Sequence, residues 1–266
     1  MPSRAPSPVA APEPNAFVRL VAHPVRWRLL EALAHSDRAV WELTQLLDEP
    51  QNLVSYHLRQ LRDGGLVSAR RSTADARDSY YAVDLARCEE QFRATGRALH
   101  PGLRFARVPP EPVSRTKKPP RVLFLCTGNS ARSQIAEALL VDMSQGAVDA
   151  VSAGSNPKPL HPNAVRVMKQ RGVDISTYRT KHLDTFVGQP FDAVITLCDR
   201  VREVCPEFPR QPMTAHWSIP DPALEASTNR ASFPAFVRTA DELATRIGYL
   251  LYRLNEVPNR RLQHGH

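Results

Sequence analysis

Residues 121–133 read RVLFLCTGNSARS, and they indicate the architecture of the second half of the chain. The run from Arg121 to Leu125 is continuous and apolar, which is typical of a strand buried in a parallel sheet. Small and polar residues follow it, and apolar residues then recur at helical spacing from Ile135 to Met143. A strand, a short loop and a helix in this order predict a loop whose backbone N–H groups converge at the helix N-terminus and bind an oxyanion.

Cys126 opens this loop and Arg132 closes it. Around a tetrahedral oxyanion, the first side chain of such a loop lies beneath the central atom, and the Arg six residues later returns to bind two oxygens. The same N–H groups favour the thiolate form of Cys126. An ordinary strand-to-helix connection is the alternative. The other oxyanion-binding candidates are the remaining loop residues and the start of the helix: Thr127, Gly128, Asn129, Ser130, Ala131 and Ser133.

Two more cysteines, Cys198 and Cys205, follow a second apolar run at 191–197 that predicts another parallel strand. Cys198 therefore lies at the sheet edge that also carries the Cys126 loop. Seven residues of helix separate the two thiols by about 10 Å, too far for a disulfide without local unwinding. A phosphatase needs no such pair, whereas a redox enzyme needs one thiol to attack the first sulfur and another to resolve it. Two incidental buried cysteines are the alternative, and the spacing does not suit zinc; we expect no metal and no cofactor.

Asp221 lies between Pro220 and Pro222, on a loop that the two prolines stiffen. A carboxylic acid held in this way could protonate a leaving oxygen. An ordinary Asp-Pro turn is the alternative.

The first half of the chain predicts a winged helix-turn-helix. Helical patterns begin at Pro24, at Val40 and near residue 51, and Gly64-Gly65 ends the third helix before a hairpin at 66–83. A generic three-helix domain with a solvated polar face is the alternative. The DNA-binding candidates are the polar face of the third helix and two arginines of the hairpin: Gln51, Asn52, Ser55, Tyr56, Arg59, Gln60, Arg70 and Arg71.

Composition and length agree with two folded domains. The chain has 266 residues, 42% of them hydrophobic, and no apolar run approaches the ~20 residues of a membrane span. The net charge is +8, and residues 1–119 hold 18 Lys and Arg against 13 Asp and Glu, a balance that permits nucleic-acid binding. Four cysteines without an export signal predict reduced thiols and a cytoplasmic location. We expect a first domain at 15–103, a proline-rich linker at 104–119 and a second domain at 120–257.

The first domain resembles the winged-helix repressors of the ArsR type. This resemblance implies a double-stranded DNA operator as partner and a homodimer formed through the terminal helices, here Ala86–Leu99. The Cys-x-Cys pair of the arsenic sensors in that family is replaced by Ala39 and Trp41, and Cys88 alone predicts a small buried side chain rather than a ligand. The segments that carry the resemblance are HPVRWRLLEAL (23–33), VSYHLRQLRDGGLVSARR (54–71) and SYYAVD (79–84).

The second domain resembles the thioredoxin-coupled arsenate reductases, which share the fold of the low-molecular-weight tyrosine phosphatases. The resemblance implies an α/β fold with a parallel sheet, arsenate as substrate, and thioredoxin or another dithiol as reductant. The segments that carry it are CTGNSARSQIAEAL (126–139), SAGSNPKPLHPNAVRVMKQRGVDIS (152–176), VITLCDRVREVCPEFP (194–209) and HWSIPDPA (216–223).

The resemblance also implies roles for single residues: Cys126 as nucleophile, Arg132 as oxyanion clamp, Cys198 and Cys205 as relay, Asp221 as acid, Ser133 as a hydrogen-bond partner of Cys126, and Asn129 as the residue that holds the loop. Two positions depart from the related families. Ala131 stands where the reductases often have Cys, and Ala223 stands where the phosphatase branch has Tyr.

The sequence therefore predicts a DNA-binding regulator fused to an arsenate reductase. Two alternatives stay open. One is a phosphatase that uses Cys126, Arg132 and Asp221 without a relay. The other is a regulator whose second domain only senses an oxyanion.

Overall fold

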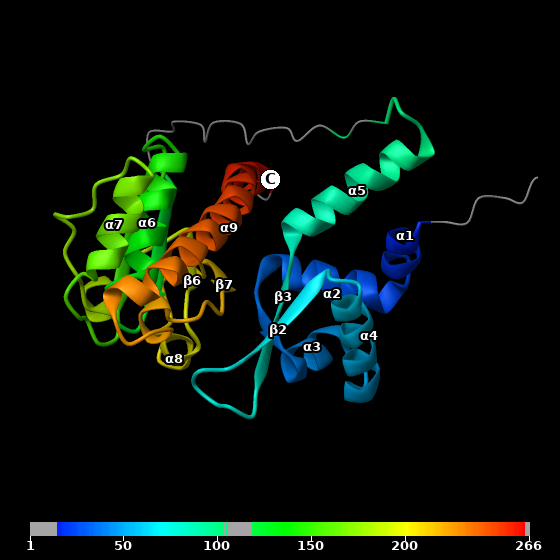
Figure 1. Cartoon of the computed structure of the whole chain (residues 1–266), viewed down its shortest axis with the longest axis horizontal. Coiled ribbons are helices and arrows are strands. Elements are labelled where there is room, and N and C mark those ends of the chain that lie inside the picture. The colour runs from blue at the N-terminus through cyan, green and yellow to red at the C-terminus, as the bar shows by residue number, and fades with distance from the viewer. Residues whose placement is uncertain (1–14, 104, 106–118, 264–266) are drawn as a thin grey trace, which may run out of the picture.

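The computed structural model describes residues 15–103, 105 and 119–263, with side chains described as far as Asn255 in the last range. It shows two domains side by side, with helix α9 (Asn229–Gln263) between them (Figure 1). Almost all of the predicted linker at 104–119 lies outside the described residues. None of the helices in the described residues combines the length and the hydropathy that a membrane-spanning segment needs.

The first domain is helical with a small antiparallel sheet of order β1-β3-β2. Strands β2 and β3 form the predicted hairpin, the wing, whose tip is the turn at 72–78. Its elements are α1 (Ala16–Val21), α2 (Pro24–His35), β1 (Arg38–Ala39), α3 (Val40–Leu47), α4 (Gln51–Asp63), β2 (Val67–Arg71), β3 (Ser79–Val83) and α5 (Leu85–Leu99).

Local signals set the ends of these helices. The side chain of Asn15 caps α1, and Pro24 occupies the first turn of α2, where its missing N–H costs no hydrogen bond. Helix α4 ends before Gly65, which has a φ of +71° that favours glycine. Buried side chains of α2, α3 and α4, among them Leu29, Leu43 and Leu58, form a core separate from that of the second domain. The predicted winged helix-turn-helix order is therefore present.

The second domain is α/β, as predicted, with an all-parallel sheet of order β5-β4-β6-β7. The second strand run predicted at 191–197 is shorter in the structure, because only four residues pair. The elements are β4 (Arg121–Cys126), α6 (Arg132–Met143), β5 (Asp149–Gly154), α7 (Pro162–Gln170), η1 (Leu183–Phe186), β6 (Ala193–Thr196), α8 (Asp199–Glu203), β7 (Met213–His216), η2 (Pro222–Leu224) and α9 (Asn229–Gln263).

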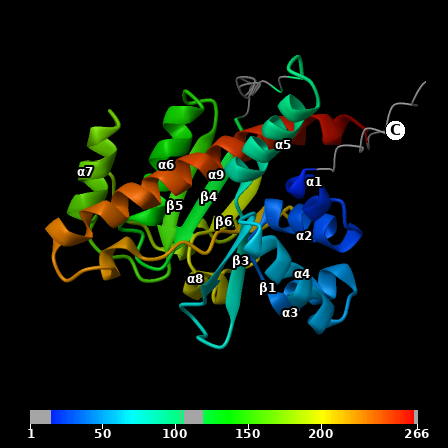
Figure 2. The same ribbon diagram turned by 45° about the vertical axis from the view of Figure 1, so that its right-hand side comes forward.

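The order of the strands places the site. From β4 the chain moves to one side for β5 and returns to the other side for β6, so the order reverses at β4. In open parallel sheets, ligands bind at the carboxyl ends of the strands at such a reversal. Helix α9 lies across α6 and the sheet in Figure 2, and the two helices pack against each other.

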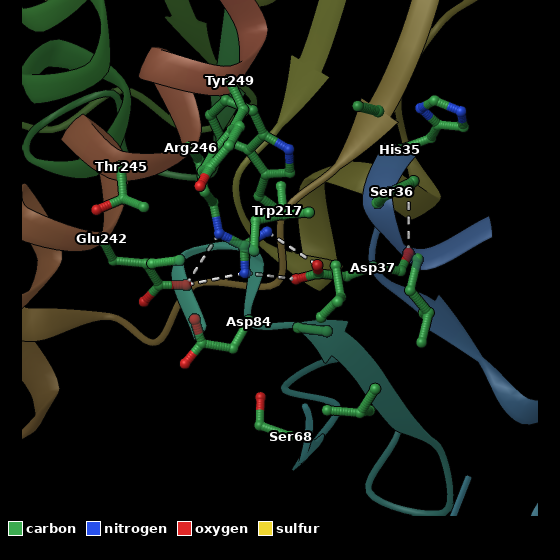
Figure 3. Close-up of a pocket in the computed structure, with 18 of the residues that line it drawn as sticks. His35, Ser36, Asp37, Ser68, Asp84, Trp217, Glu242, Thr245, Arg246 and Tyr249 are labelled. Carbon is green, nitrogen blue, oxygen red and sulfur yellow. Dashed lines mark hydrogen bonds and ion pairs between the residues drawn. The ribbon is translucent and has the colours of Figure 1, made fainter. Parts of the chain in front are cut away.

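The two domains touch through charged side chains beside a cavity of about 610 Å³. In Figure 3, Arg246 of α9 lies between Asp37, at the end of α2, and Glu242. The carboxylate of Asp37 accepts 2.8 Å hydrogen bonds from Arg246 Nη1 and from the backbone N of Ser218. Asp37 thus joins the first domain to the segment that precedes Asp221.

Candidate functional site

The loop after β4 surrounds the sulfur of Cys126 with hydrogen-bond donors. The backbone N of Asn129 lies 3.2 Å from Sγ, and the hydroxyl of Ser133 lies 3.0 Å from it. Helix α6 begins at Arg132, so its N-terminal partial positive charge also faces this loop. Cys126 is buried, and the arrangement can stabilise both a thiolate and a bound oxyanion.

Asn129 holds the loop in this shape. Its φ of 44° is left-handed, a conformation that Asn adopts more readily than most residues. Its fully buried side chain donates to Ser133 Oγ at 2.9 Å and to Ser152 Oγ at 2.8 Å, and its carbonyl oxygen accepts from the backbone N of Lys181 at 2.7 Å. Because these partners come from three segments, several independent hydrogen bonds fix the conformation of the loop.

Arg132 and Asp221 meet at the mouth of the loop. Arg132 Nη2 donates to Asp221 Oδ2 at 2.8 Å, and Nη1 donates to the carbonyl oxygen of Ile219 at 2.9 Å. The Nε of Arg132 is buried and has no hydrogen-bond partner among the described residues. A buried donor of this kind fits an oxyanion ligand, because leaving it unpaired is costly. Asp221 is about one-third exposed and lies beside the same guanidinium.

Cys198 lies at the same sheet edge as Cys126. It directly precedes α8, is buried, and has its Sγ 3.3 Å from the hydroxyl of Thr127, the residue after Cys126. Cys205 lies beyond the other end of α8, is half-buried, and contacts the carbonyl oxygen of Pro206 at 3.7 Å. Burial raises the pKa of the Cys205 thiol. All of the cysteines are free thiols; Cys198 lies against Thr127, the residue after Cys126, and Cys205 lies beyond the far end of α8.

Sequence reasoning did not identify Gly154, at the end of β5. A Cβ on Gly154 would lie within 2.9 Å of backbone atoms of Cys126, Thr127 and Asn129. Only a residue without a Cβ therefore lets the loop approach β5 this closely. The available signal was the glycine in SAGSNP, directly after a strand.

A buried polar network behind α8 was also not identified from the sequence. His216 bonds Thr196 Oγ1 through Nδ1 at 2.9 Å and Asp199 Oδ1 through Nε2 at 3.0 Å. Burial by itself would raise the pKa of Asp199, but hydrogen bonds from His216 and from the backbone N of Thr73 bring it well below its ordinary value. Asp199 is therefore a carboxylate that links α8 to the wing.

The predicted nucleic-acid face lies on α4, and Arg71 is exposed at the end of β2. Arg70, also predicted at this face, instead lines the cavity between the domains, where burial lowers its pKa and its Nε has no partner among the described residues. The predicted residues of α4 divide into exposed Gln51, Asn52, Tyr56 and Arg59 and partly buried Ser55 and Gln60.

Comparisons with known proteins agree with a helix-turn-helix domain followed by an α/β domain. Residues 121–260 match the family described as low molecular weight phosphotyrosine protein phosphatase, and residues 21–69 match a helix-turn-helix domain. Over 126 residues, 47% of the chain, the sequence is 39% identical to the arsenate reductase of Halalkalibacterium halodurans and 36% identical to that of Bacillus subtilis, covering 91% of each. A solved structure of an arsenate reductase in the phosphate binding state is 27% identical, with a TM-score of 0.45, and the match covers 51% of this chain and 98% of that one.

Proposed function

The chain belongs to the low molecular weight phosphotyrosine protein phosphatase family through residues 121–260, and from this premise we propose that it is an arsenate reductase fused to a DNA-binding regulator domain. The curated relatives support reduction of arsenate over hydrolysis of a phosphoester. The observation that carries the proposal is the second thiol at the loop, Cys198, 3.3 Å from Thr127 Oγ1. Hydrolysis of a phosphoester does not require a second thiol.

The reaction begins with arsenate on the loop. The N–H groups and Arg132 bind its oxygens, and the Cys126 thiolate attacks arsenic. An As–O bond breaks as the S–As bond forms, and Asp221 protonates the departing oxygen, which leaves as water.

The relay then transfers two electrons to arsenic. The Cys198 thiolate attacks the sulfur of Cys126; the S–As bond breaks, its electron pair stays on arsenic, and arsenite leaves. Cys205 next attacks Cys198, which frees the Cys126 thiolate and moves the disulfide to Cys198–Cys205. A dithiol protein of the thioredoxin class reduces that disulfide. One arsenate and two thiols thus give one arsenite, one water and one disulfide.

The test is arsenate-dependent oxidation of reduced thioredoxin by the purified chain, with Cys126→Ser as the inactive control. Cys205→Ala should reduce about one arsenate per chain, because the disulfide stays at Cys126. Sustained turnover by Cys205→Ala would contradict the relay. The whole proposal would be contradicted by two results together: no arsenate reduction by the wild type, and phosphatase activity that Cys198→Ser leaves unchanged.

We propose that the first domain binds double-stranded DNA through α4 and that it does so as a homodimer. Helix α5 exposes two large apolar side chains, Phe92 and Leu99, with 45% and 76% of their surface accessible. Such a face on a terminal helix suits a second copy of this domain. Sedimentation of the wild type and of Leu99→Glu tests this: the variant should shift toward the monomer.

A further inference from the structure

Helix α8, the short helix between Cys198 and Cys205, connects the two relay cysteines and also contacts the first domain. Asp199 Oδ2 accepts hydrogen bonds from Thr73 at the tip of the wing, at 2.6 Å from its backbone N and 3.0 Å from its hydroxyl. Arg202 forms an ion pair with Glu42 of α3 and lies 5.1 Å above the ring of Tyr80. The residues between the two relay cysteines therefore clamp both the wing and the helix-turn-helix.

The contacts of Asp199 with Thr73 and of Arg202 with Glu42 cannot persist once Cys198 and Cys205 form a disulfide. Cys198 and Cys205 flank the five residues of α8, which alone rise by ~7–8 Å along the helix axis, whereas a disulfide brings two Cβ atoms to about 4 Å. Formation of the Cys198–Cys205 disulfide must therefore unwind α8. Unwinding changes the positions of Asp199 and Arg202, which lie within the helix, and so breaks their bonds to Thr73 and Glu42.

We propose that the thiol–disulfide state of Cys198 and Cys205 and the DNA affinity of the first domain are coupled through α8, with Thr73 and Arg202 as the positioning residues. The inference rests on the proposed function, in which arsenate takes two electrons from the relay and the Cys198–Cys205 disulfide forms. The reduced protein binds DNA, and turnover on arsenate weakens that binding.

The wing explains why oxidation should weaken DNA binding and not strengthen it. In the reduced protein, α8 orders the wing tip through Thr73, next to the exposed Arg71. A wing that is ordered in advance loses less conformational entropy when it meets DNA. Other contacts between the domains do not involve α8, among them the ion pair of Arg246 on α9 with Asp37 (Figure 3) and the hydrogen bond from Tyr249 of α9 to Glu89 of α5, so the domains stay attached while the wing is released.

Coupling of this kind is reciprocal. If oxidation weakens DNA binding by about tenfold, a typical strength for coupling between two sites, DNA must stabilise the dithiol to the same extent. For a two-electron couple, a tenfold difference raises the reduction potential of the disulfide by ~30 mV. A substitution that only perturbs folding would not produce this shift.

The experiment uses the full chain and double-stranded DNA selected from a random 30-base-pair library by the reduced protein. Affinity is measured by fluorescence anisotropy in buffers of reduced or oxidised dithiothreitol, and mass spectrometry verifies the disulfide. We expect about tenfold weaker binding after oxidation of the wild type. The reduction potential is measured with and without the same DNA. Because no arsenate is used, a failure of arsenate reduction and a failure of this coupling are separate results.

Matched variants distinguish the loss of the α8 contacts from a general loss of stability or of DNA binding. Asp199→Ala combined with Arg202→Met should give nearly equal affinities in the two states, because Asp199 accepts both hydrogen bonds from Thr73, whereas Thr73→Ser should keep the difference. Arg77→Ala is the control on the same wing, because the bonds of Arg77 go to Asp75 and not to α8. Hydrogen exchange of the wing amides at 72–79, measured on the wild type alone, should accelerate on oxidation. Equal affinities, equal exchange or an unchanged potential in the wild type would overturn the proposal.

Discussion

Replacing Gly154 with Ala tests how closely the oxyanion loop must approach β5. An added Cβ would lie 2.6 Å from the carbonyl oxygen of Thr127 and 2.8 Å from the backbone N of Asn129. These are backbone atoms, so no side-chain rotation relieves the contact. Ordinary van der Waals contact begins at 3.4 Å, and the loop must therefore move by about 0.8 Å. Gly154 does not have a left-handed φ, so the effect of Ala is steric and not conformational.

A displacement of about 1 Å in a reacting geometry costs on the order of 100-fold in rate. We expect kcat/KM for arsenate to fall by about that factor, and the free energy of unfolding to fall by ~1–3 kcal/mol, as for other overpacked sites. Steady-state oxidation of thioredoxin and urea unfolding measure the two quantities. Gly102→Ala is the control, because its Cβ would meet only the His100 side chain on the surface. A Gly154→Ala enzyme with the kinetics of the wild type would refute the argument.

Three further predictions concern single side chains. Arg132→Lys should lower kcat/KM for arsenate by about 10²–10³-fold, because Lys cannot bind two oxygens as a planar fork; activity near that of the wild type in steady-state assays would contradict the role of Arg132. Because burial raises the pKa of Cys205, the thiolate fraction at neutral pH is small, and the rate of the second disulfide exchange should rise about tenfold per pH unit between about pH 6 and 8. Rapid-quench kinetics on one turnover would detect this rise, and a flat profile would argue against Cys205 as the resolving thiol. Arg59→Ala, on the exposed face of α4, should weaken binding of the selected DNA by ~1–3 kcal/mol in anisotropy titrations, and unchanged affinity would exclude α4 as the recognition helix.

Much of the fold could be predicted because its signals are local. The apolar run before Cys126 is a strand, the stripes from Pro24 onward are helices, and Gly65 ends α4, since each depends on neighbours a few residues apart. The contact between Cys126 and Ser133 is equally local, because one loop brings them together. The family and its activity followed from the same short segments.

The placement of Arg70 shows where local reasoning stops. Its position on the wing suggested a contact with phosphate, but the second domain covers that side of the strand and leaves Arg71 exposed. Nothing within the first domain indicates which face of the wing is covered. That depends on how two separately folded cores dock.

Local sequence patterns were enough to predict which elements form and to indicate the residues that we propose carry the chemistry, because hydrophobic period, turn residues and motif spacing act over a few residues. Long-range packing was needed to show that Arg132 pairs with Asp221, that Gly154 lets the loop approach β5 and that Asp199 of α8 bonds Thr73. These contacts join segments far apart in the chain. They exist because the packing of the sheet and of the two domains fixes distances that no local pattern encodes.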